Sequence, residues 1–567
     1  MSDNLDIANY LRETGLLLSA KGDNPFKARA YIKGAQAIES LQMDIGGLIK
    51  EDRLTDVPGI GKSLANTIKE IYSSGSSKLL HNLKEELPEG VIELSNLPGM
   101  SLQRIKLLDS ELGIKSLEEL EKACKTQVVR TVKGFTARTE RALLGAIERY
   151  KNRSTSMLLV DALELADEIQ LFLKPASKDS EVLVTGELRK WYETIESIQF
   201  VVSAKDSKKI TARLKKYPLV QKVEDESSDR IKVLLSSGVT VEIFFAENPT
   251  LKLMETTGKE HFQHLQKLAK AKHFKLTSNT FTRKHPIIVV TESQVYDALG
   301  IALVPPEMRE DAGEIEQAKE DDFSNLIDIG DIKGMTHCHS TFSDGRHSIE
   351  QMARAADKLG MKYITMTDHS PTAHYAGGLT IDRLKQQWEE IDEVQEKVNV
   401  RILKGTECDI LADGQLDYPD EILEKFDVII ASIHNRYRQN EEQMTKRLLR
   451  GLKNPLFKIW GHPLGRLVLR RDPIPCDIEK IFDAVQDANI AIEISGDPYR
   501  LDLQPLWIKA ARKRGFKFVI STDEHTMSDM LNLTFGIHMA RRAGVTKTEV
   551  LNAQTYSFFK KTVKPAS

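Results

Sequence analysis

The sequence predicts a multidomain fold with a helical N-terminal region, an α+β middle part and a C-terminal α/β domain. Up to residue 150, apolar residues recur with helical period in stretches that Gly and Pro interrupt. Short β-rich runs such as IQFVVS and VTVEIFFA follow between residues 155 and 250. From residue 331 on, strand-like runs alternate with helices (YITMTD, VRILKGTE, DVIIAS, KIWGHP, IAIEIS, KFVISTD), which is typical of a barrel built on a parallel sheet.

Composition narrows the class of protein. The 567 residues allow about three to five domains, and an apolar content of 41% is enough for several cores. The net charge of −3 creates no global attraction for nucleic acid, so any such binding must use local patches or backbone donors. Four widely spaced cysteines suggest a reducing compartment, and the N-terminus lacks a signal-peptide pattern. Because no apolar run is long enough to span a membrane, we expect a soluble cytoplasmic monomer.

A glycine turn between two predicted helices occurs in LTDVPGIGKSLANTIKEIY (54–72), the helix-hairpin-helix pattern of proteins that bind DNA irrespective of sequence. Such a turn exposes backbone N–H groups above a helix N-terminus, where they bind phosphate without a charged side chain. Two weaker copies follow, with Ser101 and Thr136 in place of the second glycine. One copy alone is equally well explained by an ordinary helix corner, but three in succession favour DNA backbone binding. The residues expected to contact DNA here are Gly59, Gly61, Lys62, Gly99 and Gly134.

Metal-ligand residue types gather in the C-terminal domain, beginning with MTHCHSTFSDGRHS (335–348). His337 and His339 lie two apart on a predicted strand and share a face, whereas Cys338 points the opposite way and packs. Further His, Asp and Glu residues recur where the other predicted strands end, and in a parallel barrel these ends meet at one face. Imidazole and carboxylate together suit Mn, Zn or Fe, and neighbouring ions can clamp a phosphate. The shared strand-end context disfavours the alternative of unrelated core histidines.

The C-terminal motifs HCHSTFSDG, TDHS, GTECDILADGQLDYPDE, ASIHN, GHP, EIS and STDEH resemble the PHP (polymerase and histidinol phosphatase) family over residues 331–545. The resemblance implies a distorted (βα)7 barrel that holds three divalent metal ions, with Mn²⁺ expected and Zn²⁺ or Fe as alternatives. The catalytic residues that it implies are the metal ligands themselves. It assigns the first ion to His337, His339, Glu407 and Asp523, the second to Glu407, His434 and His462, and the third to Asp344, His369 and His525.

Two further groups of charged residues surround these motifs. Asp409, Asp413 and Asp417 extend the acidic loop after Glu407, and a solvated turn explains them better than a ligand role. Three arginines are candidate contacts for a phosphate or for the DNA backbone, although a surface position or a salt bridge explains each one alone better. They are Arg436, Arg466 and Arg500, of which we expect the first two to contact DNA.

The order of parts, from hairpins through a β-rich domain to a PHP domain, resembles bacterial family X DNA polymerases over essentially the whole chain. The resemblance divides the chain into a small 5′-phosphate- and DNA-binding domain (1–90), fingers (91–150), a palm (151–250), a thumb (251–312), a linker (313–330) and the PHP domain (331–567). The thumb signature is TTGKEHFQHLQKLAKAKHFKL, in which Phe262 replaces the usual Asn. The stretch 313–330 is acidic and weakly apolar, which indicates a linker or a solvated helix.

The palm-like segment TGELRKWYETIESIQFVVS (185–203) departs from the family pattern of Gly-Ser, two arginines and a strand with two aspartates. Neutral Ser197 and Gln199 stand in place of the aspartates. Nucleotidyl transfer needs two Mg²⁺ ions held by carboxylates, so we expect a palm that folds but does not polymerise. Glu187, in place of the serine, adds negative charge where the family binds the incoming triphosphate. The degenerate site comprises Gly186, Glu187, Arg189, Ser197, Gln199 and Glu242.

The leading hypothesis from the sequence is a protein of base excision repair whose PHP domain removes nucleotides from a DNA 3′ end. Its expected partner is a gapped or 3′-ended duplex, and the resemblance also allows 3′-phosphatase or abasic-site endonuclease activity. The alternatives are a gap-filling polymerase with 3′-5′ exonuclease, a small-molecule phosphatase and a non-catalytic DNA scaffold. The polymerase needs carboxylates at positions 197 and 199, the phosphatase has no use for hairpins, and a scaffold would tolerate loss of metal ligands, none of which is lost.

Overall fold

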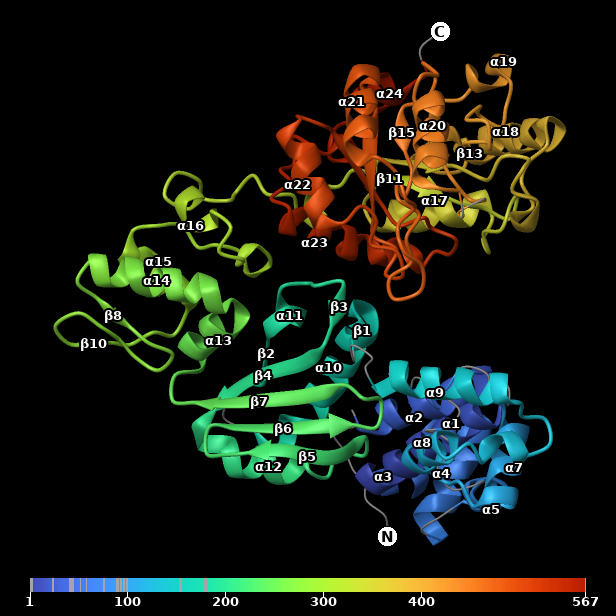
Figure 1. Cartoon of the computed structure of the whole chain (residues 1–567). Helices are drawn as coiled ribbons and strands as arrows, with labels where there is room; N and C mark the ends of the chain where they lie inside the picture. The colour runs from blue at the N-terminus through green and yellow to red at the C-terminus, as the bar shows by residue number, and fades with distance from the viewer. Residues whose placement is uncertain are drawn as a thin grey trace.

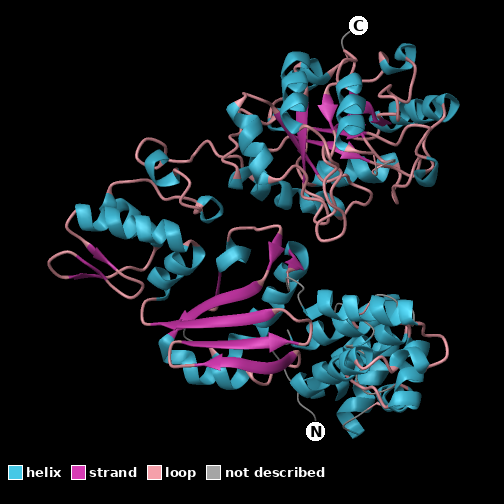
Figure 2. Ribbon diagram, in the orientation of Figure 1, coloured by secondary structure: helices cyan, strands magenta, loops and turns pink. Residues whose placement is uncertain are grey.

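The computed structural model describes residues 4–22, 25–39, 45–50, 52–57, 59–74, 77–87, 91, 94, 97, 100–151, 156–177, 181–435, 437 and 439–565. A helical N-terminal part lies beside a palm-like sheet, a smaller thumb-like part follows, and an α/β barrel forms the C-terminal end (Figure 1). Strands are concentrated in the palm-like sheet and in the barrel (Figure 2). No helix within the described ranges has the length and apolar character needed to cross a membrane.

The N-terminal part is helical throughout its described residues, and its core is built from the apolar faces of these helices. Ile68 and Ile71 of one helix and Ile105 and Leu108 of another are fully buried in that core. The helices are α1 (Asn4–Lys21), α2 (Pro25–Glu39), α3 (Ile45–Lys50), α4 (Lys62–Ser74), α5 (Lys78–Glu86), α7 (Leu102–Leu112), α8 (Leu117–Lys125) and α9 (Ala137–Lys151).

The palm-like part is a five-stranded sheet in the order β2-β4-β7-β6-β5, in which β4 and β7 run parallel and the other pairs antiparallel. Along β4, Ile198 and Phe200 are buried while Ser197 and Gln199 lie half-exposed on the opposite face, as strand alternation predicts. The elements are β1 (Met157–Leu158), α10 (Leu159–Leu173), β2 (Leu183–Thr185), α11 (Gly186–Arg189), β3 (Thr194–Ile195), β4 (Ser197–Ser203), α12 (Ser207–Leu214), β5 (Val220–Glu226), β6 (Arg230–Leu235) and β7 (Thr240–Ala246).

The thumb-like part packs helices against a small three-stranded antiparallel sheet. Its elements are α13 (Pro249–Thr257), α14 (Lys259–Ala271), β8 (Lys275–Leu276), β9 (Phe281–Thr282), β10 (Pro286–Ile287), α15 (Glu292–Leu299) and α16 (Glu314–Gln317). Residues 313–330 are not simply solvated, because Ile315 and Phe323 are buried in the thumb core. Glu314 is also buried, where it accepts a hydrogen bond from His261 at 2.5 Å.

The predicted barrel is confirmed as seven parallel strands in sequence order, β11 to β17. A parallel bridge between Cys338 and Glu524 links the first strand to the segment after the last and nearly closes the barrel. Strands such as β14 and β16 are buried at every position, as expected when helices cover the outside and side chains fill the inside. The strands are β11 (Gly334–Cys338), β12 (Tyr363–Met366), β13 (Arg401–Asp409), β14 (Val428–Ser432), β15 (Ile459–Trp460), β16 (Ala491–Ser495) and β17 (Phe518–Ser521). The helices are α17 (Ile349–Lys358), α18 (Ile381–Gln395), α19 (Asp420–Leu423), α20 (Glu441–Gly451), α21 (Ile478–Ala488), α22 (Pro505–Lys513), α23 (Leu533–Arg542) and α24 (Tyr556–Val563).

The turn at residues 186–194 connects the palm-like sheet with both neighbouring parts, and we call it the domain joint. Toward the thumb, Arg189 donates two hydrogen bonds of 2.9 Å to Glu292, which also accepts two of 2.9 Å from Arg309. Toward the barrel, the Trp191 ring stacks on His538 with centroids 3.7 Å apart. The apolar core of the sheet continues without a break into the barrel core. The palm-like part is therefore anchored on two sides.

Candidate metal centre and palm site

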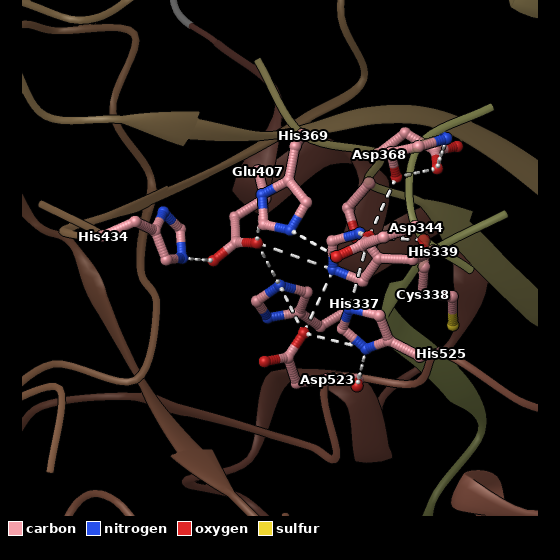
Figure 3. Close-up of polar contacts among 12 residues, drawn as sticks. His337, Cys338, His339, Asp344, Asp368, His369, Glu407, His434, Asp523 and His525 are labelled. Carbon is pink, nitrogen blue, oxygen red and sulfur yellow. Dashed lines mark hydrogen bonds and ion pairs between the residues drawn. The ribbon is translucent and has the colours of Figure 1, made fainter. Parts of the chain in front are cut away.

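The candidate metal ligands converge at the carboxyl ends of the barrel strands, where their sequence positions predicted them (Figure 3). His337 lies on β11 and Glu407 on β13, and the others lie one to three residues beyond the ends of their strands or in the loops that follow. His462 and Asp523 have positive backbone φ angles of 22° and 55°, a conformation that L-residues seldom adopt. Such strain is typical of functional sites, because the surrounding fold must hold it.

Glu407 is the centre of the cluster and is fully buried. One of its carboxylate oxygens lies 2.7 Å from His462 Nε2 and 3.0 Å from His434 Nε2. The other lies 3.1 Å from His369 Nδ1 and 3.4 Å from His337 Nε2. A carboxylate with imidazole nitrogens around both oxygens has the arrangement of a ligand that bridges two ions.

The donor set fits divalent ions, because its atoms are aimed at one another and lack hydrogen-bond partners. Buried atoms without a partner include His337 Nε2, both ring nitrogens of His339, Glu407 Oε2 and Asp523 Oδ1. An unsatisfied buried polar atom is costly, and a bound cation would satisfy several of these at once. Three groups have ligand atoms within 4.8 Å of one another: His337, His339, Glu407 and Asp523; His339, Asp344, His369 and His525; and His369, Glu407 and His434.

These groups agree with the expected ligand sets in most members. The first group has the same four members as the expected first set, and the second contains Asp344, His369 and His525 with His339 added. In the third group His369 accompanies Glu407 and His434 where His462 was expected. His462 nevertheless lies 3.3 Å from His434, ring nitrogen to ring nitrogen, so it stays within the same cluster.

The charges of the cluster are strongly coupled. Burial alone would raise the pKa of Glu407, but His434 and His337 outweigh it and lower that pKa well below its ordinary value. Burial would lower the pKa of His337, but the carboxylates of Glu493 and Glu407 raise it well above its ordinary value. For His339, burial and the neighbouring His525 and His369 lower the pKa to about 4. The carboxylates and imidazoles of the cluster thus shift one another's pKa values strongly.

Buried carboxylates behind the ligands hold them in place. Asp368 belongs to the motif TDHS and Glu493 to EIS, but neither was in the expected ligand sets. His337 Nδ1 lies 2.7 Å from Glu493 Oε1, which leaves Nε2 of His337 directed at the cluster. Asp368 accepts hydrogen bonds from the backbone N–H of Ser340 at 2.8 Å and of Ser343 at 3.1 Å, and so shapes the loop that carries Asp344. The signal that could have found Glu493 is a carboxylate in the middle of a strand that is otherwise apolar.

The acidic loop after Glu407 is not the solvated turn that was expected. Asp409 is fully buried, and its Oδ1 lies 3.3 Å from His434 Nδ1. Asp417 accepts hydrogen bonds from the backbone and hydroxyl of Thr372. Only Asp413 of the three has an exposed side chain. Asp409 and Asp417 therefore orient parts of the site.

The three candidate arginines have different positions. Arg466 is buried, with 6% of its surface exposed, and donates to the Arg500 and Leu501 carbonyls and to Glu193. Arg466 is therefore a structural contact between barrel and palm, and the prediction that it binds DNA is wrong. Arg436 lies outside the described residues. Arg500 faces the cluster, with its guanidinium 3.6 Å from Asp523.

Two of the three hairpin turns contain a glycine in the left-handed backbone conformation. Gly59 and Gly134 have φ angles of 89° and 91°, which only glycine adopts without strain. Lys62 begins α4 next to Gly61, and both are exposed. In the second copy, Gly99 lies outside the described residues, and Ser101 acts as the N-cap of α7 by accepting from Arg104 N–H at 3.4 Å.

In the palm-like sheet, Gln199 and Glu242 lie side by side on neighbouring strands. β4 and β7 pair so that Gln199 faces Glu242, and the Gln199 amide donates to that carboxylate at 3.0 Å. Arg230 on neighbouring β6 lies 3.4 Å from the other Glu242 oxygen. Gly186 has a φ of 66° and lies against the Gln199 side chain, where a Cβ would clash. An amide and a guanidinium thus surround the only carboxylate of the expected set.

The three remaining palm residues serve other contacts, and the Ser197 hydroxyl donates to the Thr240 carbonyl at 3.4 Å. Glu187 accepts a hydrogen bond from the backbone N–H of Glu196 at 2.8 Å, across the turn. Arg189, which matches the motif of the family, is engaged with Glu292 in the domain joint. Neither Glu187 nor Arg189 is thus free for an incoming nucleotide.

Comparison with known families defines the class of the protein. The family model of the PHP domain matches residues 336–496, and that of the DNA polymerase beta thumb matches residues 252–310. A helix-hairpin-helix domain matches residues 2–77, and a SAM-like helix-hairpin-helix tandem matches residues 91–149. The class is thus a polymerase-type chain with DNA-binding hairpins and an attached PHP domain.

Individual relatives make the assignment specific. The chain is 34% identical over 559 residues to the DNA polymerase/3′-5′ exonuclease PolX of Bacillus subtilis (strain 168), a match that covers 97% of each chain. It belongs to the PolX family of DNA polymerases with a PHP domain. Probable phosphatases of Thermoanaerobacter sp. (strain X514) and Caldanaerobacter subterraneus are 34% and 29% identical over 236 residues, 38% of this chain and 89% and 85% of theirs.

Proposed function

We propose that this protein is a DNA-repair nuclease whose PHP domain removes nucleotides from DNA 3′ ends and whose palm no longer polymerises. The carrying observation is that a complete set of candidate metal ligands stands in the same chain as a palm site that has kept one carboxylate of three. Support also comes from the relative that covers nearly the whole chain, which is named as a polymerase and 3′-5′ exonuclease.

The residues of the PHP centre would hold divalent ions, of which Mn²⁺ is the first candidate. They would also position a phosphodiester next to these ions. Bound divalent ions supply Lewis acidity, which makes water more acidic and neutralises phosphate charge. Glu407 offers one oxygen to each side of the cluster and so sets the spacing within it. Arg500, beside Asp523, directs a positive charge at the place where a phosphate would meet the centre.

The palm is proposed to be inactive because its charges are wrong for two Mg²⁺ ions. Two divalent ions would face a single carboxylate, Glu242, which already accepts from Gln199 and lies beside Arg230. Loss of even ~4–5 kcal/mol of charge stabilisation lowers a rate by three orders of magnitude or more. The palm retains its fold and its place beside the hairpins, so it would still grip DNA.

A gapped duplex with a labelled primer tests both halves of the proposal. In Mn²⁺ we expect the wild-type primer to shorten, and added nucleotides to produce no extension. His339→Ala is expected to abolish the shortening, because His339 belongs to two of the three ligand groups. Primer lengths on a denaturing gel measure both outcomes. Robust extension by the wild type would contradict the inactive palm, and equal shortening by His339→Ala would contradict the PHP site.

The similarity to probable phosphatases makes a small phosphate monoester the second candidate substrate, since those relatives match only the PHP part of the chain. A DNA enzyme should lose monoesterase activity when excess DNA occupies the centre. A small-molecule phosphatase should be indifferent to DNA. Hydrolysis of p-nitrophenyl phosphate with and without competing duplex separates the two.

Glu493→Gln is expected to weaken metal binding about 10- to 100-fold, the usual effect of removing a carboxylate that orients a ligand histidine. In the wild type, Glu493 Oε1 lies 2.7 Å from His337 Nδ1 and fixes the His337 ring with a charged acceptor. Glutamine keeps the shape of Glu493 but removes this charge. Titration of the metal-free protein with Mn²⁺, followed by calorimetry, measures the affinity. Glu350→Gln on α17, where Glu350 pairs with Arg354, is the control and should bind Mn²⁺ like the wild type. If Glu493→Gln bound Mn²⁺ as tightly as Glu350→Gln, the orienting role of Glu493 would be contradicted.

A further inference from the structure

A row of tyrosine and arginine side chains leads away from the metal centre. At its inner end the Tyr375 ring lies 6.2 Å from the His369 ring, centroid to centroid, and 71% of Tyr375 is exposed. On the other side of the cluster Arg500 lies 3.6 Å from Asp523. We call this row the tyrosine–arginine rim; its members are Tyr375, Tyr437, Tyr499, Arg470, Arg471 and Arg500.

The outer half of the rim consists of two arginine–tyrosine pairs, and the two arginines lie on one short hairpin. Arg471 lies over the Tyr437 ring at 4.1 Å, and Arg470 lies over the Tyr499 ring at 5.3 Å, each measured from the guanidinium carbon to the ring centroid. An antiparallel bridge between Leu467 and Arg471 holds the hairpin together. The rim is therefore ordered by the backbone before any ligand binds.

The hairpin also contacts both Tyr437 and Tyr499. Its Val468 N–H donates to the Tyr499 carbonyl at 2.8 Å. Arg471 Nε donates to the Gly465 carbonyl at 2.8 Å, and Gly465 packs against the Tyr437 ring. The spacing between the two arginine–tyrosine pairs is thus set by the fold.

The rim is exposed and positively charged. Tyr499 is 45% exposed, and Leu469 at the tip of the hairpin is 58% exposed. Within the part of the chain that the structure describes, Arg470 and Arg471 have no carboxylate within 4.0 Å, whereas nearby Glu193 is neutralised by Arg466 and Arg542. Such cations stacked on aromatic rings bind nucleic acid when exposed.

The rim ends at the palm. A cavity of about 600 Å³ is lined by Glu193 and Thr194 of the palm on one side and by the hairpin from Arg466 to Asp472 on the other. In Figure 1 the barrel presents this region toward the end of the palm that carries β1 and β3.

We propose that the tyrosine–arginine rim binds the single-stranded 3′-terminal segment of a DNA substrate and leads its end to the metal centre. The bases stack on the tyrosines, and the backbone phosphates face the arginines. A paired strand has its bases stacked on their neighbours and cannot present them to the rings, so the rim selects unpaired ends. The cleavage of that end rests on the proposed function, whereas the binding does not require cleavage.

Equilibrium binding of DNA tests the rim independently of catalysis. The probe is a 5′-fluorescein hairpin with a short single-stranded 3′ tail, titrated with the full chain in EDTA and followed by anisotropy. Tyr499→Ala and Tyr375→Ala are each expected to weaken binding roughly 5- to 150-fold, the usual effect of removing one stacking ring. Tyr499→Phe and Tyr375→Phe keep the ring and should bind within about threefold of the wild type. Arg470→Ala should flatten the dependence of affinity on salt.

Two controls identify what the rings bind. A tail of abasic sugar phosphates should bind more weakly to the wild type and be insensitive to the Tyr→Ala changes, and a blunt hairpin should likewise be insensitive. The proposal that the rim binds DNA would be overturned if both Tyr→Ala variants kept wild-type affinity, or if an abasic tail bound as tightly as a tail with bases. If the affinity losses occur but Mn²⁺ produces no shortening of the tail by the wild type, the rim stands and the proposed nuclease fails.

Discussion

Glu407→Gln is expected to lower the rate of DNA shortening about a thousandfold or more, because it removes the carboxylate shared by both sides of the candidate centre. Its two oxygens lie within 3.5 Å of His462, His434, His369, His337 and His339. A loss of ~4 kcal/mol of transition-state stabilisation corresponds to a factor of a thousand in rate. Single-turnover cleavage of a labelled 3′ end measures the rate, and elemental analysis of the purified protein measures the bound ions.

A matched control lies in the same loop. Asp413→Asn also removes one negative charge, but Asp413 has an exposed side chain and its carboxylate accepts only from the Gln415 N–H among the hydrogen bonds of the described residues. This variant should cleave like the wild type. A Glu407→Gln protein that folds, keeps its ions and cleaves at the normal rate would refute the bridging role.

Glu292→Ala is expected to destabilise the thumb and its attachment to the palm by about 3–5 kcal/mol, the usual cost of removing one partner of a buried ion pair. Glu292 binds two guanidinium groups, Arg189 from the palm and Arg309 from the thumb, and Arg309 is fully buried. Without Glu292 two positive charges face each other with no counter-charge. Hydrogen–deuterium exchange should show faster exchange in α11 and α15, and urea denaturation should show an earlier transition.

The same carboxylate predicts how stability depends on pH. Burial alone would raise the pKa of Glu292, but Arg309 and Arg189 outweigh it and lower the pKa from its ordinary 4.5 to about 2. Because the folded-state pKa is the lower one, this stabilisation is complete above pH 4.5 and is lost as the pH falls toward 2. Glu316→Ala, which removes an exposed glutamate of the same part, should change stability by no more than about 0.5 kcal/mol. An acid transition shared by wild type and Glu292→Ala would contradict this assignment.

The PHP fold and most of its site could be predicted because both depend on local pattern. A run of apolar residues that ends in His, Asp or Glu predicts a buried strand and its functional end together, and the barrel brings such ends to one face. His337, Glu407 and Asp523 follow this rule, and the structure places them in one group. Strand alternation in β4 also predicted that Ser197 and Gln199 lie on the face opposite Ile198 and Phe200, and the burial of Ile198 and Phe200 confirms it.

What the sequence did not predict depends on contacts between distant segments. Arg466 was expected at the DNA surface, but its guanidinium is buried between carbonyl groups and a palm carboxylate. Glu493 lies in the motif EIS but received no role, because its partner, His337, is 156 residues away. Glu314 looked like part of a solvated stretch until the fold placed it against His261. The role of each of these side chains depends on its partner in the fold, and the local sequence does not show which distant residue that partner is.

The domain joint has a consequence for the history of this palm. Arg189 matches the family pattern, but here its guanidinium donates to Glu292 and Thr257 of the thumb. Ser197→Asp with Gln199→Asp would introduce two carboxylates, yet it would leave this guanidinium occupied and Arg230 beside Glu242. Freeing Arg189 as well would loosen the attachment of the thumb. Under the proposed function the palm serves to hold its neighbours in place, and selection for that rigidity would oppose a return to synthesis.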